Sequence, residues 1–494
     1  MNKKSFFMSL LLMAGMTACI NDADVNSGSY GDDSETGMDL SVSIVVPNSS
    51  SLTKATAEDS EVYDKGNAGE YQVNKVDLYL FNSETDIFYN VFALKNLSKV
   101  DNGNSNLTVK YKGSVAVNPG SYKILAIANS DKMYYAASLK QLLAEVDKNT
   151  YANGLVSVNS ITSTGIMMTN RGNETESAQQ PIVVESGKST SLTITLERVL
   201  AKLTIREQQD KWDLKHDGST YVTIDPLAFR YVNLNTHFFL FRHVATLSGT
   251  AFPSEISDWS PVSRYFTNIP DVDGYAIDPY FFEKKPGEAA SFNRFVHPLN
   301  TGFVQDGAIN TGDPSVVYCL ENTNFRTAQL QGYTTGVIIQ CKMDIAAGHC
   351  FDENQTPVSS QDITGDVYYF NHNFYTSIEA INAKNNLSIP NNASENVLAE
   401  KYYVKRFSRS EGGSYVCYYT YWIKHLDDPD GMGAMEYAVV RNNMYSITIT
   451  DISNLGDGEP GTDPEIPVEK KGSIDVDVDV MPWFVRDNGA VLED

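Results

Sequence analysis

Apolar and polar side chains alternate along most of the chain with a period of two, which is the spacing of a β-strand that buries one face. The first such run is Leu40, Val42, Ile44 and Val46. Similar runs follow at residues 73–81, 107–112, 122–128, 182–184 and 192–196, with turn-forming residues between them. Leucines at helical spacing over residues 138–146 predict one short helix capped by Ser138. We therefore expect an N-terminal β-sandwich of about 150 residues.

A second group of strands begins near Arg198. Its alternating runs lie at residues 199–205, 220–224, 238–247, 316–320, 335–343, 415–423 and 437–450. Polar segments at 293–314 and 383–395 interrupt these runs and predict long surface loops. The pattern indicates a larger second sandwich, and an all-β fold with a few short helices.

The first nineteen residues have the pattern of an export signal. Lys3 and Lys4 precede an apolar stretch at residues 6–13, and small residues then lead to Cys19. This stretch is too short to span a bilayer and predicts a signal peptide. Small residues directly before a cysteine resemble the lipobox of bacterial lipoproteins, in which that cysteine becomes the acylated first residue. Lipidation (palmitate) at Cys19 is thus expected, and an ordinary signal peptide with a chance cysteine is the alternative.

The charge of the chain excludes one large class of function. The sequence has 62 acidic and 38 basic side chains, which gives a formal charge of −24. A general nucleic-acid binder needs a basic surface, so this class is excluded. Residues 21–39 are mostly Gly, Ser, Asn and Asp and predict a tether between the lipid and the first strand. A lipid, rather than a basic patch, would hold so acidic a protein at a membrane.

Candidate metal and catalytic residues are few. Cys319, Cys341, Cys350 and Cys417 could form two disulfides or remain buried thiols, and their spacing leaves both open. Cys341, His349 and Cys350 suggest zinc, but adjacent His and Cys point apart in a strand. Segments 271–274 and 428–431 resemble calcium loops without the later glutamate, and acid-glycine turns explain them better. No catalytic or phosphate-binding motif is present, so we expect no metal, no cofactor and no enzyme.

An aromatic cluster near the C-terminus suggests a rival function. Tyr415, Tyr418, Tyr419, Tyr421 and Trp422 could stack on sugars, as in a glycan-binding surface lipoprotein. Strand alternation places Tyr419 and Tyr421 on one face and Tyr418 and Trp422 on the other. At least one of these pairs is therefore expected in the core.

Several segments, in order along the chain, together resemble the fimbrillin family of Bacteroidales fimbriae. They are the lipobox, residues 52–55 after the first strand, and residues 196–202, 317–323, 440–449 and 480–483. The resemblance implies two tandem transthyretin-like β-sandwich domains that polymerise into surface fimbriae, the type V pili. It also implies a structural subunit that contributes to cell adhesion.

The family mechanism can be placed on this sequence. The resemblance implies a precursor lipid-anchored in the outer membrane, and a surface protease that cuts behind the first strand, here between Lys54 and Ala55. Many members have arginine at this position, so Lys54 departs from the pattern, and an ordinary loop lysine is the alternative. The cut releases the strand with Leu40, Val42, Ile44 and Val46. A strand from the C-terminal region of the next subunit then fills the groove, so the expected partners are further copies, accessory subunits and the protease.

The C-terminal region has a matching apolar pattern. Its apolar residues, the predicted donor tail, are Ile474, Val476, Val478, Val480, Trp483, Val485, Val491 and Leu492. Aspartates occupy the opposite face of the first four. The Gly, Pro and acid residues of 456–464 predict a linker that lets the tail swing away from its own domain. The alternative is an ordinary last strand whose aspartates discourage unwanted edge pairing.

These inferences divide the chain into five predicted parts. They are a signal peptide (1–18), a lipidated propeptide with tether and first strand (19–54), an N-terminal sandwich (55–197), a C-terminal sandwich with long loops (198–472) and a C-terminal strand or donor tail (473–494). Strand, cleavable loop and tail in one chain favour a stalk subunit over a tip or accessory adhesin. The expected location is the outer membrane before processing and the fimbrium afterwards.

Overall fold

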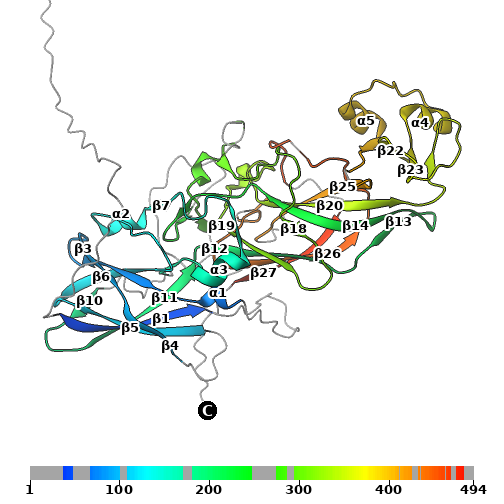
Figure 1. Cartoon of the computed structure of the whole chain (residues 1–494). Helices are drawn as coiled ribbons and strands as arrows, with labels where there is room; N and C mark the ends of the chain where they lie inside the picture. The colour runs from blue at the N-terminus through cyan, green and yellow to red at the C-terminus, as the bar shows by residue number, and fades with distance from the viewer. Residues whose placement is uncertain are drawn as a thin grey trace, which may run out of the picture.

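The computed structural model describes residues 37–47, 67–100, 108–170, 181–246, 274–285, 287, 294–410, 412–425, 432–433, 435–461, 463–468 and 474–482. This part of the chain is mostly β-strand in several sheets, with a few short helices (Figure 1). The predicted fold class is confirmed at this level. The description as two tandem transthyretin-like domains and the five boundaries remain predictions.

The N-terminal half builds one continuous path of strands in the order β3-β2-β6-β9-β11-β1-β5-β4, with β10 beside β6. Its strands are β1 (Met38–Pro47), β2 (Val76–Asn82), β3 (Phe88–Ala93), β4 (Lys95–Val100), β5 (Thr108–Val117), β6 (Gly120–Ala128), β9 (Met168–Asn170), β10 (Ile182–Val184) and β11 (Thr190–Arg198). Strand β11 pairs with β1 through Thr190–Thr195 and with β9 through Leu196–Arg198. It therefore connects two layers, whose inner faces share one apolar core.

The C-terminal half has two main sheets. One has the order β27-β26-β12-β19-β8 and the other β13-β14-β20-β25, with β18 beside β14. The strands are β8 (Leu155–Ser157), β12 (Leu200–Glu207), β13 (Trp212–His216), β14 (Ser219–Val232), β18 (Gly307–Ala308), β19 (Ser315–Leu320), β20 (Gly336–Ile345), β25 (Tyr415–Trp422), β26 (Asn443–Ile452) and β27 (Ile474–Pro482). Leu203 and Ile205 of the first sheet pack with Ile224, Ile339 and Tyr419 of the second.

The two halves repeat one arrangement of strands. In the N-terminal half, β1 pairs antiparallel with β5 and parallel with β11. In the C-terminal half, β12 pairs antiparallel with β19 and parallel with β26. The first strand of each half thus pairs in parallel with a strand near the end of the same half. A parallel pair needs a long crossover connection rather than a hairpin. The two first strands differ in how the chain connects them. Strand β12 follows β11 directly, whereas residues 48–66 are the only covalent connection between β1 and the rest of its half.

An insertion between β20 and β25 was not predicted. It contains β21 (Cys350–Phe351), β22 (Val367–Phe370), β23 (Asn373–Tyr375), β24 (Lys405–Phe407), α4 (Ile378–Asn385) and α5 (Glu395–Tyr402). It projects from the end of the molecule opposite the N-terminal sheet (Figure 1). The prediction of a long loop at 383–395 is wrong at both ends, because α4 extends to Asn385 and α5 begins at Glu395. Ser377 caps α4 by accepting a hydrogen bond from the Ala380 N–H.

The remaining elements are short. They are α1 (Ala68–Tyr71), α2 (Leu139–Leu143), α3 (Val158–Thr164), η2 (Phe281–Glu283), η4 (Arg326–Ala328), β7 (Val146–Asp147), β15 (Phe238–Phe239), β16 (Val244–Thr246) and β17 (Gly274–Ala276). Helix α2 confirms the helix predicted at 138–146, with Ser138 as its cap. Among the described residues, no helix has both the length and the apolar character that crossing a bilayer would need.

The two halves are packed against each other rather than merely tethered. Strand β8, from the N-terminal half of the sequence, pairs with β19, and β7 pairs with β15. One apolar cluster contains Phe81 and Leu142 together with Phe238, Tyr318 and Met444. Residues on both sides of Arg198 therefore contribute to one shared core.

Candidate functional site: the first strand and its groove

Strand β1 lies inside the N-terminal sheet, between two strands that come later in the chain (Figure 1). Met38–Pro47 pairs antiparallel with Thr108–Val117 of β5 along its whole length. Residues 40–45 pair in parallel with Thr190–Thr195 of β11 on the other side. The backbone of β1 is thus paired along both edges, and β5 and β11 do not pair with each other.

The apolar row of β1 is completely buried. Leu40, Val42, Ile44 and Val46 each have 0% exposed surface. They pack in the same core as Leu78 and Ile124 of the opposite layer. Burial of four such side chains contributes roughly 6–12 kcal/mol as an upper estimate. This is comparable to the whole stability of a typical domain, about 5–15 kcal/mol, so the sheet cannot lose β1 without a replacement and keep its core dry.

Removal of β1 would leave a groove of defined shape. Strands β5 and β11 would be two open edges separated by about 10 Å, which is two strand spacings. Val115 and Ile194, both buried, would become part of the exposed floor. A β-strand with apolar residues at every second position would restore the backbone pairs and the core.

The residues that would control release of β1 lie outside the described part of the chain. These are Cys19, the predicted lipid attachment, and Lys54 and Ala55, the predicted cleavage site. The described chain resumes at Asn67. The sequence predictions for these three residues therefore stay predictions.

The structure describes only part of the predicted donor tail, up to Pro482. Ile474–Pro482 forms β27, which pairs antiparallel with β26 of the same chain from Ile452↔Ile474 to Asn443↔Pro482. It is the edge strand of its sheet. Trp483, Val485, Val491 and Leu492 lie outside the described residues. The structure thus places the row Ile474, Val476, Val478 and Val480 in an intrachain strand, and its role as donor stays a prediction.

The linker before β27 differs from its prediction. Residues 456–464 were expected to let the tail swing, but the chain here is docked on the C-terminal half. Asp457 exchanges backbone hydrogen bonds with Tyr418 at 2.8 and 2.9 Å. The Gln331 and Gly332 N–H groups donate to the carbonyls of Ile466 and Pro464, and Val468 is buried. Backbone pairing with neighbouring strands outweighs the flexibility that Gly and Pro suggest.

The aromatic cluster on β25 is part of the core. Tyr419 belongs to the core between the two main sheets, and Tyr421 packs against it. Trp422 and Tyr418 pack in a second cluster with Val232 and Ile338. Both faces of β25 are therefore covered, as alternation predicted, and this cluster does not form a sugar platform.

The cysteines are buried thiols in the structure. Cys319, Cys341, Cys350 and Cys417 are unpaired, and burial raises the pKa of Cys319 to about 12. Cys341 and Cys417 are cross-strand neighbours on β20 and β25. Within the described part of the chain, no group of three His, Cys, Asp or Glu side chains could hold a metal ion.

A buried polar hub joins the two halves close to Asn67, where the described chain resumes after β1. Glu70 of α1 accepts hydrogen bonds at its carboxylate from Lys202 Nζ at 2.9 Å and from the Tyr318 hydroxyl at 2.7 Å. Its backbone carbonyl accepts a hydrogen bond from Arg198 Nε at 2.6 Å. Arg198 also donates through its backbone N–H and Nη1 to Asn442 Oδ1. Burial lowers the pKa of Arg198 to about 10.

This hub explains several of the segments that carried the family resemblance. Arg198 and Lys202 come from residues 196–202, and Asn442 comes from residues 440–449. Asn322, from residues 317–323, donates to the carbonyls of Asn233 and Tyr333 and accepts from Lys284 Nζ. Glu70 was not predicted as a buried residue, because a lone glutamate in a polar stretch is normally exposed.

Two family models match the chain. Residues 32–267 match the model described as "Fimbrillin-A associated anchor proteins Mfa1 and Mfa2". Residues 413–489 match "Major fimbrial subunit protein type IV, Fimbrillin, C-terminal". The first match includes β1 and its groove, and the second includes β25, β26 and β27. A search of curated proteins found no match.

Solved structures of similar proteins have low sequence identity to this chain. A fimbrilin (FimA) from Porphyromonas gingivalis W83 is 14% identical, with 90% of this chain and 98% of that chain covered and a TM-score of 0.37. The tip fimbrial protein Mfa3 from P. gingivalis is 11% identical, covering 90% and 100%, with a TM-score of 0.33. A proposed cell adhesion protein from Parabacteroides distasonis is 13% identical, covering 90% and 100%, with a TM-score of 0.41.

The two matched family models include β1 and most residues of the hub. Residues 32–267 contain β1, Glu70, Arg198 and Lys202, and residues 413–489 contain Asn442. The members of this family are structural proteins of fimbriae. The chain belongs to the fimbrillin family of Bacteroidales fimbrial subunit proteins.

Proposed function

We propose that this protein is a stalk subunit of a cell-surface fimbrium and that it polymerises by donor-strand exchange. The observation that carries the proposal is the position of β1. It is central in its sheet and its apolar face is completely buried, yet its only covalent connection to the rest of its half is residues 48–66. A strand in this position can be removed by one cut in the connecting segment, and its loss creates a groove for an incoming strand.

The cut is proposed between Lys54 and Ala55, after export and acylation at Cys19. Before the cut, β1 fills its own groove and keeps the lipid-anchored precursor monomeric. After the cut, the lipid and β1 leave together. The subunit is then held at the cell by its neighbours in the fibre, by accessory fimbrial subunits and by the contacts it makes through its groove.

The donor is proposed to come from the C-terminal region, with Trp483, Val485, Val491 and Leu492 as the apolar residues that enter the groove. Docking of residues 456–468 on the C-terminal half restrains the chain up to Val468, which favours the part after Pro482 over β27 itself. A stalk subunit needs both groove and donor. A tip or accessory adhesin would need the groove alone, so loss of the donor discriminates between these roles.

The test uses the recombinant chain from Asn21, which lacks the lipid. Limited trypsin treatment should convert the monomer into SDS-resistant ladders and into fibres visible by electron microscopy. Trypsin can also cut after Lys65 in the same segment, so the test uses Lys65→Gln, whose fibres should begin at Ala55. The matched double variant Lys54→Gln/Lys65→Gln should not be cut in this segment and should stay monomeric.

A second variant tests the donor. Deletion of residues 486–494 should leave a folded, cleavable monomer that does not form fibres. Normal fibres from the deletion variant would contradict the donor assignment and favour β27 as the donor. A trimmed wild-type chain that stays monomeric would contradict strand exchange altogether.

A further inference from the structure

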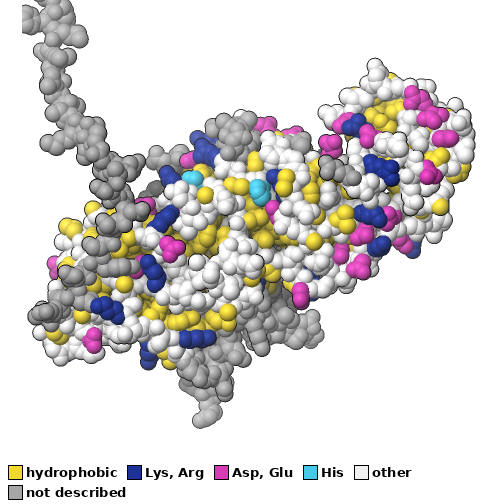
Figure 2. Space-filling model, in the orientation of Figure 1, with side chains coloured by type: hydrophobic (Ala, Val, Ile, Leu, Met, Phe, Trp, Pro, Cys, Tyr) yellow, Lys and Arg dark blue, Asp and Glu magenta, His cyan; other side chains and the backbone are white. Residues whose placement is uncertain are grey.

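The insertion of residues 346–410 projects from the main sheets and is anchored on their core through Cys350, Val367, Phe374 and Phe407. It has its own apolar core, which includes Tyr375, Ile378, Ile381 and Leu398. It projects beyond the main sheets, away from β1 and its groove (Figure 1). Acidic side chains are prominent on its visible face (Figure 2). Such a projecting insertion is a suitable place for a ligand site on a fibre subunit.

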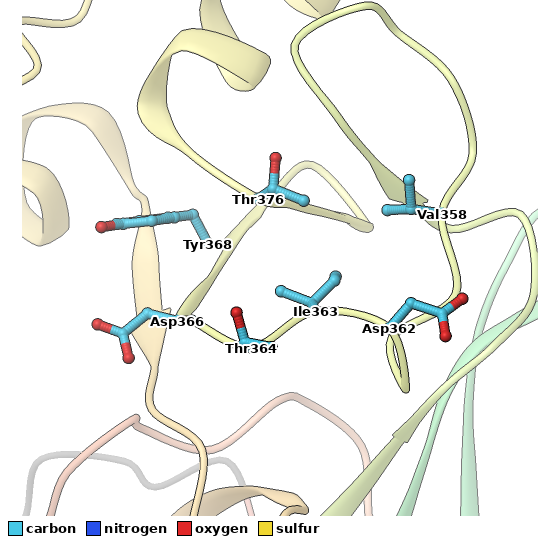
Figure 3. Close-up of a pocket in the computed structure, with 8 residues that line it drawn as sticks. Val358, Asp362, Ile363, Thr364, Asp366, Tyr368 and Thr376 are labelled. Atoms are coloured by element: carbon cyan, nitrogen blue, oxygen red, sulfur yellow. The ribbon is translucent and has the colours of Figure 1, made fainter.

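An open cleft of about 440 Å³ lies in this insertion, between the segment 358–366 and strands β22 and β23 (Figure 3). Its lining includes Val358, Ile363, Thr364, Asp366, Tyr368 and Thr376. Ile363 and Thr364 point across the open space toward Thr376, and Asp366 lies beside Tyr368 at one end (Figure 3). The volume falls in the range of small-molecule sites, roughly 300–1,000 Å³.

The wall formed by residues 358–366 is held in place from behind. Arg409 Nη1 donates to the Ile363 carbonyl at 2.6 Å, and the Tyr415 hydroxyl donates to the Gly365 carbonyl at 2.7 Å. Arg406 lies 3.6 Å from Asp366. The first two contacts use backbone carbonyls of the wall and leave the Thr364 side chain directed into the cleft. A wall fixed in this way lowers the entropic cost of binding.

The lining chemistry limits the ligand class. Its polar side chains are the hydroxyls of Thr364, Thr376 and Tyr368 and the carboxylates of Asp362 and Asp366, while Lys, Arg and His do not line it. Carboxylates accept hydrogen bonds and repel anions. The matching ligand supplies several hydroxyl donors and an apolar face that can lie against Ile363, Val358 or the Tyr368 ring.

We propose that this cleft binds saccharides that carry no acidic group, with space for one or two sugar rings. A pyranose has hydroxyl donors at its edge and C–H groups on its face, which is the combination that the lining matches. Sialylated, sulfated or phosphorylated ligands would meet the Asp362 carboxylate with no cation in the lining to offset it, and Arg406, outside the lining, is already paired with Asp366. The site is independent of strand exchange, so it is present in the uncut monomer.

Gly365 offers a clean blocking variant. A Cβ placed on Gly365 meets no atom within 4 Å, and its φ lies outside the left-handed region. The Gly365→Phe substitution should therefore fill the cleft without disturbing the fold, because the bond to Tyr415 uses the backbone carbonyl. Gly312 has the same open surroundings elsewhere on the C-terminal half, so Gly312→Phe is the matched control for an added surface phenylalanine.

The experiment applies the intact, uncut chain to an array of neutral hexose and N-acetylhexosamine oligosaccharides beside sialylated and sulfated ones. Wild type and Gly312→Phe should bind the same neutral glycans, Gly365→Phe should lose at least tenfold in affinity, and Thr364→Val should lose affinity several-fold. No binding of neutral glycans at millimolar concentration would overturn the proposal. So would binding that Gly365→Phe leaves unchanged, or a preference for acidic glycans.

Discussion

At the scale of single residues, buried histidines make the stability of this protein depend on pH. His425 is buried and its Nδ1 lies 2.8 Å from the Tyr445 hydroxyl, which itself accepts from the Val440 N–H. Burial, with Arg242 nearby, lowers the pKa of His425 to about 4. Burial also lowers the pKa of His243 to about 4.

We expect His425 to destabilise the fold in acid. Its pKa is lower in the folded chain than the ordinary value near 6.5 in the unfolded chain. The unfolded state thus binds more protons between these two values, and the stability present above pH 6.5 is lost as the pH falls toward 4. The linkage for this one group is about 2 kcal/mol at pH 5.

Urea unfolding at pH 7.5, 6 and 5 measures this effect. His425→Gln should lose less stability than wild type between pH 7.5 and 5, whatever its stability at pH 7.5. His216→Gln, at an exposed position, is the control and should follow wild type. Equal pH slopes for His425→Gln and wild type would show that His425 does not carry the linkage.

At the scale of elements, the alternating pattern predicted the strands but did not predict the insertion between β20 and β25. The row Leu40 to Val46 predicted a strand with one buried face, and the structure buries that face completely. Its central place between β5 and β11 did not follow from the sequence, because both partners are distant in the chain. The insertion was missed because α4 and α5 are each only eight residues long and bury few apolar side chains.

Local composition also misled at the linker. Gly and Pro at residues 456–464 predict mobility, yet hydrogen bonds to Tyr418, Gln331 and Gly332 dock this segment. Glu70 gave no signal, because its partners Lys202 and Tyr318 lie more than 130 residues away. Contacts between segments this far apart are invisible to periodicity.

The groove left by β1 should accept β1 itself as a separate peptide. A synthetic peptide of residues 38–47 carries the backbone and the four buried side chains that the groove requires. Added in excess to chain trimmed at Lys54, it should delay or prevent fibre growth. The matched control peptide has serine at positions 40, 42, 44 and 46, and it should have no effect because it cannot restore the apolar core. Equal fibre growth with both peptides would mean that the groove is not the site of assembly.

At the scale of the whole molecule, the hub around Glu70 locks the two halves together at the point where the chain resumes after the proposed cut. Glu70 is 2% exposed and the Lys202 side chain is 4% exposed. The two halves contact each other through this hub and through the shared core of Phe81, Phe238 and Tyr318. Release of β1 therefore leaves α1 attached to the C-terminal half, so the trimmed N-terminal half keeps its place while the groove is open.

This coupling predicts one cooperative unfolding transition for the intact chain by scanning calorimetry, and its loss when the hub is broken. Glu70→Ala leaves the Lys202 ammonium buried without its carboxylate, which costs about 3–5 kcal/mol. The transition should move down by several degrees and separate into two. Glu84→Ala, at an exposed position of the same half, should leave the transition unchanged.

The double variant Glu70→Leu/Lys202→Met tests the same pair with both charges removed. It leaves no buried charge without a partner, so it should recover much of the stability that Glu70→Ala loses. If Glu70→Ala melts like wild type, the hub does not hold the halves together, and their shared apolar core does.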